Sequence, residues 1–194
     1  VAAIVDGLLQ KTMPKHVLLD ASILLRQGKS YDLGQLTTQL ARIGYENCAQ
    51  VEGPGQFALR GGILDVFSPG EELPVRAEFF GDEIDSMGLF DPRTQRRTEN
   101  CRNALLLPAA ETLPGLHSAG QDGFLQRLSS LKDRIQKRKG NFTALLSTLN
   151  RDIELLSQKA SFPSADRYLG LIYGEAACGA DYIPADAILL YTES

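Results

Sequence analysis

The sequence predicts an α+β fold, in which a small, mostly antiparallel sheet of about five or six short strands carries one packed helix. Two observations support this prediction. Apolar residues recur at helical spacing from Leu33 to Ile43, and from Asn47 to Leu107 they fall into short segments of period two. Between those segments lie glycine and proline pairs that are typical of turns.

The helix is predicted from Asp32 to Ile43. Its apolar residues are Leu33, Leu36, Leu40 and Ile43. Asp32 has the short acceptor side chain of an N-cap, and Gly44 stands where a helix C-terminal cap belongs. The predicted strands are Asn47 to Val51, Gln56 to Arg60, Ile63 to Phe67, Val75 to Phe80, Ile84 to Phe90 and Arg102 to Leu107.

Helices and short strands are also predicted on both sides of the sheet. Residues Val1 to Leu9 are expected to form a short helix, and the apolar run from Val17 to Arg26 a strand or two. After Pro114 two more helices are predicted, one ending at Lys137-Arg138-Lys139 before Gly140 and one running from about Phe142 to Lys159. Near the end, Ala187 to Tyr191 is interpreted as a buried strand.

Composition bounds the class of protein. Of the 194 residues, 43% are hydrophobic and 23% charged, as is ordinary for a globular protein, and no apolar run is long enough to cross a bilayer. Three cysteines far apart predict no disulfide framework and favour a cytoplasmic location. The two histidines have no metal-ligand spacing. Because the chain begins with Val1, we expect a piece of a longer protein. We also expect this piece to be monomeric.

Charge is unevenly spread along the chain. Residues 31–111 hold 13 acidic side chains against 7 arginines, a difference of −6, whereas residues 123–160 hold 8 Lys and Arg against 3 acidic side chains, a difference of +5. The asymmetry predicts two regions with different surfaces. No phosphate-binding loop, zinc motif or nucleophile elbow occurs, so we expect no catalytic residue, cofactor or metal in this chain.

The strand from Val75 to Phe80 carries the candidate site. Alternation puts Arg76, Glu78 and Phe80 on the face opposite its core residues, and arginine with an aromatic ring is the composition of interface hot spots. Arg60 ends the strand that begins at Gln56, so it joins this surface if the two strands are neighbours. Two guanidinium groups there can grip carboxylates of a partner.

Purely structural roles for the same residues also remain open. Arg76 and Glu78 can be a solvated cross-strand pair worth at most about 1 kcal/mol. Phe80 can cover the apolar side of the helix from Asp32 to Ile43.

Part of this region resembles a known family. The stretch GQFALRGGILDVFSPGEELPVRAEFFGDEID, followed by FDPRTQRR, resembles a motif shared by bacterial transcription-repair coupling factors and the excision-repair helicase UvrB. The resemblance extends loosely from Leu24 to Ala109, and the closing residues Tyr182 to Leu190 are similar to the coupling factor's return into its first domain. Two features favour coupling factors: the turn from Asp91 ends in Gln-Arg where UvrB usually has Thr-Gly, and Ala58 stands where UvrB often has a second arginine.

The resemblance implies both a domain plan and a function. Residues 22–108 would be a domain that binds UvrA, inserted in a split UvrB-like first domain whose parts are residues 1–21 and 109–194. By position, the UvrA-contacting residues match Arg60, Arg76 and Phe80, with Glu78 a weaker match. The longer protein would bind RNA polymerase and translocate on double-stranded DNA with ATP and Mg²⁺ through modules outside this chain.

Two other hypotheses remain. The chain can be a fragment of UvrB itself, an ATP-dependent enzyme. Alternatively, the basic helix with Lys132, Arg134, Lys137, Arg138 and Lys139 can bind nucleic acid, although the overall acidity and the lack of interleaved aromatic residues argue against it.

Overall fold

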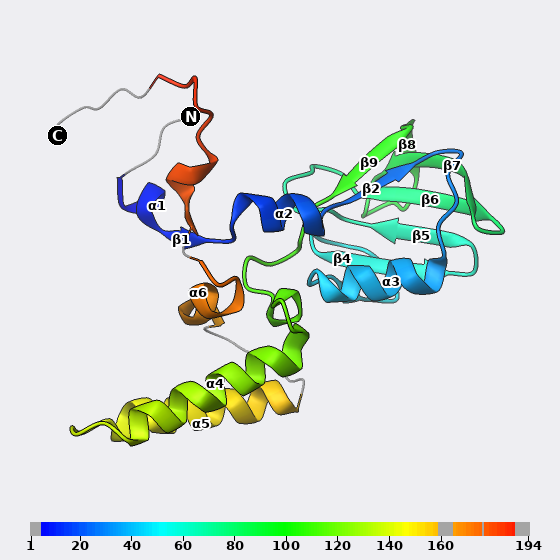
Figure 1. Cartoon of the computed structure of the whole chain (residues 1–194). Helices are drawn as coiled ribbons and strands as arrows, with labels where there is room; N and C mark the ends of the chain where they lie inside the picture. The colour runs from blue at the N-terminus through cyan, green and yellow to red at the C-terminus, as the bar shows by residue number, and fades with distance from the viewer. Residues whose placement is uncertain (1–4, 159–164, 176, 189–194) are drawn as a thin grey trace.

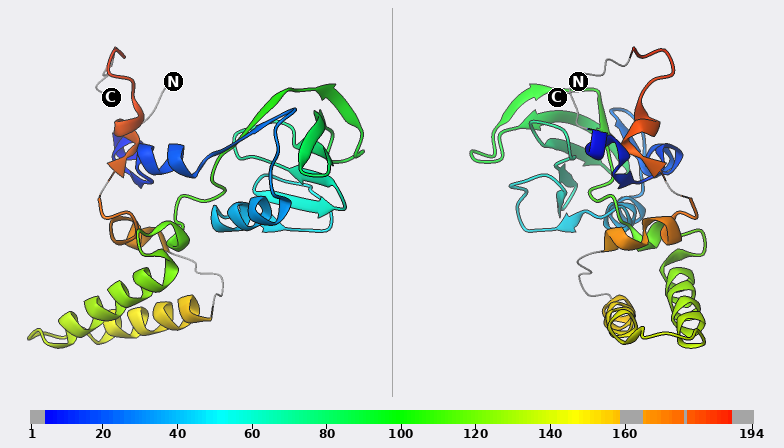
Figure 2. Two further views of the ribbon diagram at one scale, coloured as in Figure 1. Left: turned by 45° about the vertical axis from the view of Figure 1, so that its right-hand side comes forward. Right: turned by 90° about the vertical axis from the view of Figure 1, so that its left-hand side faces the viewer.

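The computed structural model describes residues 5–158, 165–175 and 177–188. Figure 1 shows three parts: a strand-rich body with helix α3, a smaller part around α1, β1 and α2, and an arm made of helices α4 and α5. The arm projects away from the strand-rich body in all views (Figures 1 and 2). The predicted α+β fold is confirmed.

A six-stranded sheet forms the body, with the strand order β3-β4-β5-β6-β7-β8. All neighbours are antiparallel except β3 and β4, which are parallel. The strands are β3 (Glu46–Asn47), β4 (Gln56–Arg60), β5 (Ile63–Val66), β6 (Val75–Phe80), β7 (Glu83–Phe90) and β8 (Arg97–Asn100). A separate pair, β2 (Ile23–Arg26) and β9 (Asn103–Leu106), is antiparallel and lies beside this sheet (Figure 1).

Helix α3 (Leu33–Arg42) packs on one face of the sheet and forms the main core with it. The Asp32 carboxylate accepts a hydrogen bond from the Gln35 backbone N–H at 2.8 Å, which confirms the predicted N-cap. Leu40 is fully buried. Gly44 follows the helix with φ 95°, a backbone conformation that a side chain would strain, and a Cβ there would meet the Leu113 side chain at 2.9 Å.

A smaller apolar cluster lies on the other face of the same sheet. It consists of Val51, Ala58, Phe67 and Phe90, all buried. Because β-strand side chains alternate between faces, Ala58 and Phe90 share their face with the predicted docking residues. This cluster supports the surface that the site occupies.

Several local predictions are wrong. The run from Val17 to Arg26 is not all strand, because helix α2 (Lys15–Ala21) precedes β2. Pro14 stands at the helix N-cap position with φ −60°, where its missing N–H costs nothing. Strand β8 was not predicted at all, because its four residues are exposed and show no apolar alternation.

The arm consists of α4 (Gly120–Gln136) and α5 (Thr143–Ser157), close to the two predicted helices. Its core holds Phe124, Leu128, Leu149 and Leu156, together with residues of the 3-10 helix η2 (Ala165–Tyr168) and helix α6 (Leu169–Ile172). Leu145 of α5 lies outside this core and is 47% exposed.

The first and last parts of the chain meet in a short antiparallel pair, β1 (Lys11–Thr12) with β10 (Ala177–Cys178). Helix α1 (Val5–Leu9) and the 3-10 helix η3 (Gly179–Tyr182) flank this pair, and a further 3-10 turn, η1 (Pro114–Leu116), precedes the arm. The predicted strand from Ala187 is absent at Ala187 and Ile188, where Ile188 is 88% exposed, and its remainder lies outside the described residues. The division at residues 21/22 and 108/109 stays a prediction.

Candidate functional site

The candidate site lies on the sheet face opposite α3. Arg60 ends β4, Arg76 and Glu78 lie on β6, and Phe80 is its last residue. We expected Arg60 to join the surface of Arg76 if their strands were neighbours. Strands β4 and β6 are not neighbours, because β5 runs between them. The two arginines nevertheless meet, through a residue on the strand that separates them.

That residue is Asp65 of β5, whose side chain is fully buried. Arg76 donates to both of its carboxylate oxygens, from Nε at 2.7 Å and from Nη2 at 2.8 Å. Arg60 donates from Nη2 to Oδ2 at 2.7 Å. A buried carboxylate is tolerated only when it is paired and hydrogen-bonded, and here two guanidinium groups do this. We call Arg60, Asp65 and Arg76 the arginine–aspartate cluster.

Arg76 is the more enclosed of the two arginines, with 16% of its side chain exposed. Its Nη1 donates to the Gln95 carbonyl oxygen and its Nη2 to Gln95 Oε1, both at 3.2 Å. The guanidinium also lies 4.4 Å from the centre of the Phe90 ring, in cation–π geometry. Hydrogen bonding to Asp65 raises the pKa of Arg76. Arg76 is therefore held mainly by contacts with its own chain.

Gln95 reaches Arg76 because of an uncommon backbone conformation. Its φ is 60°, in the left-handed region that favours glycine. Its side-chain amide also donates to the Pro92 carbonyl oxygen at 2.8 Å. Such strained residues persist where the surroundings fix them, often at functional sites. Here this backbone conformation places the backbone and side-chain oxygens of Gln95 within hydrogen-bond distance of Arg76.

The hydrogen-bond partner of Glu78 is Ser86 rather than Arg76. Glu78 Oε2 accepts a hydrogen bond from Ser86 Oγ at 2.9 Å, and Ser86 Oγ accepts one from Arg97 Nη2 at 3.2 Å. Arg76 pairs with Asp65 instead, so a solvated pair of Arg76 and Glu78 is not what the structure shows. Arg97 comes this close because it lies over Gly88, where a Cβ would be 2.5 Å from Arg97 Nε. Arg97 therefore belongs to the same face.

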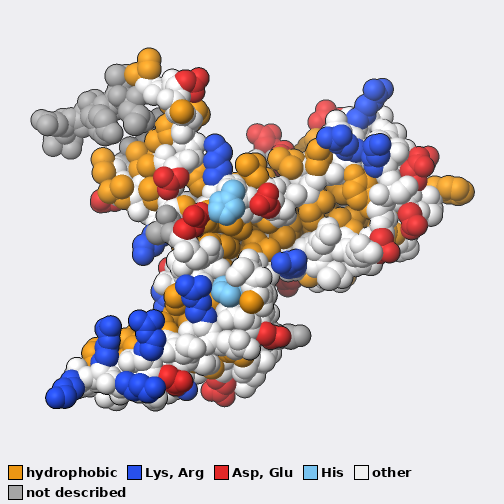
Figure 3. All heavy atoms as spheres, in the orientation of Figure 1, with side chains coloured by type: hydrophobic (Ala, Val, Ile, Leu, Met, Phe, Trp, Pro, Cys, Tyr) orange, Lys and Arg blue, Asp and Glu red, His pale blue; other side chains and the backbone are white. Residues whose placement is uncertain are grey.

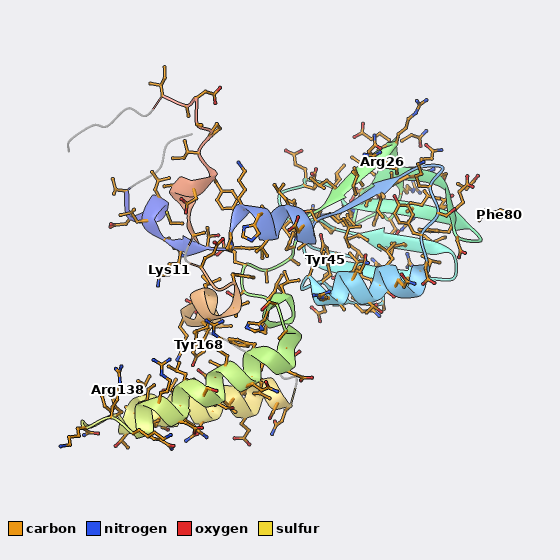
Figure 4. All side chains as sticks on the ribbon, viewed as in Figure 1. Lys11, Arg26, Tyr45, Phe80, Arg138 and Tyr168 are labelled. Atoms are coloured by element: carbon orange, nitrogen blue, oxygen red, sulfur yellow. The ribbon has the colours of Figure 1, made fainter. Side chains whose placement is uncertain are left out.

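Phe80 is 84% exposed, which contradicts the interpretation that it covers α3. Figure 4 shows it at the far end of the sheet, directed away from the body. The pairing of β6 with β7 shifts its register between Glu78 and Phe79, so Phe80 follows directly after an irregularity. A phenylalanine left in water at a strand end is available to a partner.

Sequence analysis found Arg60, Arg76, Glu78 and Phe80 but missed Asp65, Gln95 and Arg97. One signal for Asp65 was present. An aspartate inside the apolar segment Ile63 to Phe67 requires a cationic partner if that segment is a strand. Within the described part of the chain, no group of three or more His, Cys, Asp or Glu side chains could hold a metal ion. No helix there is long and apolar enough to span a membrane.

The arm carries the basic region predicted from the sequence. Figure 3 shows Lys and Arg side chains along the arm, one face of which is in view. The nucleic-acid role of Lys132, Arg134, Lys137, Arg138 and Lys139 stays a prediction. Of these residues, Arg134 lies in the last turn of α4 and Lys137 at its C-cap, where a cation also stabilises the end of the helix.

A small sheet that presents arginine and an exposed aromatic side chain on one face is typical of a protein-interaction domain. Residues 23–111 match the sequence model of the UvrB interaction domain. A transcription-repair-coupling factor of Myxococcus xanthus is 41% identical over 109 residues, which cover 56% of this chain and 9% of that protein. One of Bacillus subtilis is 30% identical over 199 residues, covering 100% of this chain and 16% of that protein.

The UvrABC system protein B of Thermotoga neapolitana is also similar, at 27% identity over 156 residues, 76% of this chain and 23% of that protein. The chain belongs to the family of transcription-repair coupling factors and contains the interaction domain that this family shares with UvrB. The higher identities to coupling factors favour this family over UvrB itself. The chain spans 16% of the length of the Bacillus subtilis relative, and 9% in the shorter match to Myxococcus xanthus.

Proposed function

We propose that this chain is a docking module that binds UvrA through the sheet face carrying Arg60, Arg76, Glu78 and Phe80. The observation that supports this most is the 84% exposure of Phe80 on the same sheet face as the arginine–aspartate cluster, within a UvrB interaction domain. Interface hot spots are enriched in arginine and in large aromatic side chains. The proposed role of the face is recognition of a partner.

In the longer protein, the module recruits excision-repair proteins to a stalled RNA polymerase in the cytoplasm. The longer protein itself is an ATP- and Mg²⁺-dependent translocase that meets RNA polymerase and double-stranded DNA through modules outside this chain. The docking module itself acts as a monomer, without catalysis, cofactor or metal. The family membership supports these roles, since the UvrB interaction domain occurs in repair proteins named for coupling transcription to repair.

Binding of purified UvrA to the 194-residue chain tests this function, measured by isothermal titration calorimetry. Phe80→Ala is the cleanest variant, because so exposed a side chain contributes little to folding. Loss of an interface anchor costs about 2 kcal/mol or more, so Phe80→Ala is expected to weaken binding about thirtyfold. The double variant Arg60→Ala/Arg76→Ala is expected to weaken it more than tenfold.

Leu19→Ala is the matched control, because Leu19 is an exposed apolar residue of α2, at 63%, away from the sheet face. It is expected to bind UvrA as the unaltered chain does. Unchanged affinity in both folded test variants would refute the assigned surface, and absence of binding by the unaltered chain would refute the function.

A further inference from the structure

The two arginines of the site have unequal numbers of hydrogen-bond donors left for a partner. A guanidinium has five N–H donors. Arg76 makes four hydrogen bonds, two to Asp65 and two to Gln95. Among the described residues, the Arg60 side chain makes one, to Asp65, and 47% of it is exposed. Among the described residues, four N–H donors of Arg60 and one of Arg76 are thus left for a partner.

The charges of the cluster also indicate that Arg60 is the arginine available to a partner. Two guanidinium groups and one carboxylate carry a net charge of +1. Arg76 meets Asp65 through two parallel bonds and is 16% exposed, so its charge is neutralised inside the protein. The remaining positive charge is therefore displayed at Arg60. A partner group that complements it is a carboxylate.

An apolar residue lies next to Arg60 on the sheet. Ile63 lies directly opposite Arg60 on β5 and opposite Glu78 on β6, and it is 37% exposed. A partner that covers Ile63 excludes water from a carboxylate bound at Arg60, and this strengthens the ion pair. The single bond to Asp65 also restrains Arg60 before binding, which reduces the entropy lost on association.

We infer that Asp65 is the positioning residue of this docking site: it fixes Arg76 inside the sheet and orients Arg60, and Arg60 is the guanidinium that contacts an acidic side chain of the partner. The inference rests on the proposed binding of UvrA and deepens it. Arg76 supports the site through Asp65 and is not a principal contact. Asp65, being buried, never touches the partner.

A double-mutant cycle distinguishes this role from a purely structural one. Arg60→Ala, Asp65→Asn and the double variant are made in the 194-residue chain. Their UvrA affinities are measured at a temperature at which circular dichroism shows all of them folded. Arg60→Ala is expected to weaken binding about thirtyfold in the unaltered background. In the Asp65→Asn background, where Arg60 has lost its orienting partner, the same change is expected to weaken binding less than about fivefold. Equal effects in both backgrounds would overturn the inference.

A second variant removes any dependence on the folding of Asp65→Asn. Arg60→Lys keeps the charge at an exposed position, but an ammonium group is a point charge that lacks the planar fork of a guanidinium. It is expected to leave the urea midpoint unchanged and to weaken UvrA binding about tenfold or more. Binding equal to that of the unaltered chain would overturn the inference.

Arg26→Ala is the control, because Arg26 is an exposed arginine of β2, outside the six-stranded sheet (Figure 4). It is expected to bind as the unaltered chain does. If the unaltered chain does not bind UvrA, the proposed function and this inference fall together. If it binds, and the Arg60 variants bind equally well, only the inference falls.

Discussion

Replacing Arg76 with alanine should destabilise the fold far more than replacing Arg60 with alanine. Both arginines contact the same carboxylate, but Arg76 supplies two of its three bonds and closes it from solvent. Without Arg76, the fully buried Asp65 retains one bond to an arginine that is 47% exposed. The folded chain then carries an inadequately paired buried charge.

The magnitudes follow from burial. Removing one partner of a buried ion pair costs about 3–5 kcal/mol, and Arg60 offsets part of this, so we expect about 3 kcal/mol for Arg76→Ala. Loss of the contact with the Phe90 ring, 4.4 Å from the guanidinium, is included in that figure. Arg60→Ala removes one bond of a half-exposed side chain, for which about 1 kcal/mol is an upper bound after solvent screening.

Urea unfolding followed by far-ultraviolet circular dichroism measures both variants, and the midpoints are compared at constant m-value. The double variant Asp65→Leu/Arg76→Met is the matched control. It removes the buried charge with its partner, so it should recover most of the stability that Arg76→Ala loses. A midpoint for Arg76→Ala that is no lower than that for Arg60→Ala would refute the assignment of Arg76 as the internal arginine.

Two further predictions concern the sheet and its core. Gly88→Ala should destabilise the chain by about 1–3 kcal/mol in urea unfolding, because a Cβ there would be 2.5 Å from both the Glu99 carbonyl oxygen and Arg97 Nε. Gly53→Ala is the control and should be neutral, because a Cβ at Gly53 would have nothing within 4 Å. Burial raises the pKa of Tyr45 to about 12, above the 10 of an unfolded chain. The contribution of neutral Tyr45 to the free energy of unfolding is therefore complete below pH 10 and should be lost between about pH 10 and 12. Urea unfolding at a series of pH values measures this loss. Gly88→Ala as stable as Gly53→Ala, or Tyr45→Phe with the same alkaline loss, would contradict these expectations.

Local chemistry explains which elements could be predicted from the sequence. Helix α3 was predicted closely, because Asp32 and Gly44 mark its ends and its leucines keep one period. Strand β8 was missed because an exposed edge strand needs no apolar alternation. Helix α2 was misread as strand because Val17, Leu18 and Leu19 together show no helical period. In that segment, packing against the neighbouring elements decides the outcome.

The candidate site was predictable in part for a similar reason. Alternation within β6 correctly places Arg76 and Glu78 on the face away from the main core. What a side chain on that face touches depends on the neighbouring strand and its register, which alternation does not contain. The register sets Asp65 opposite Arg76, so Arg76 pairs with its own sheet, which alternation along β6 could not indicate.

The position of Ala58 shows how the same register limits the number of arginines at this site. Ala58 lies directly opposite Asp65 on β4 and is 1% exposed, in the small cluster with Phe90. An arginine side chain at residue 58 would have to open that cluster, and it would compete for a carboxylate whose oxygens already accept three bonds. One buried carboxylate can fix one arginine inside the sheet and orient a second outward. With alanine at residue 58, the cluster keeps a net charge of +1, and that charge is displayed at Arg60 on the exposed side of the face.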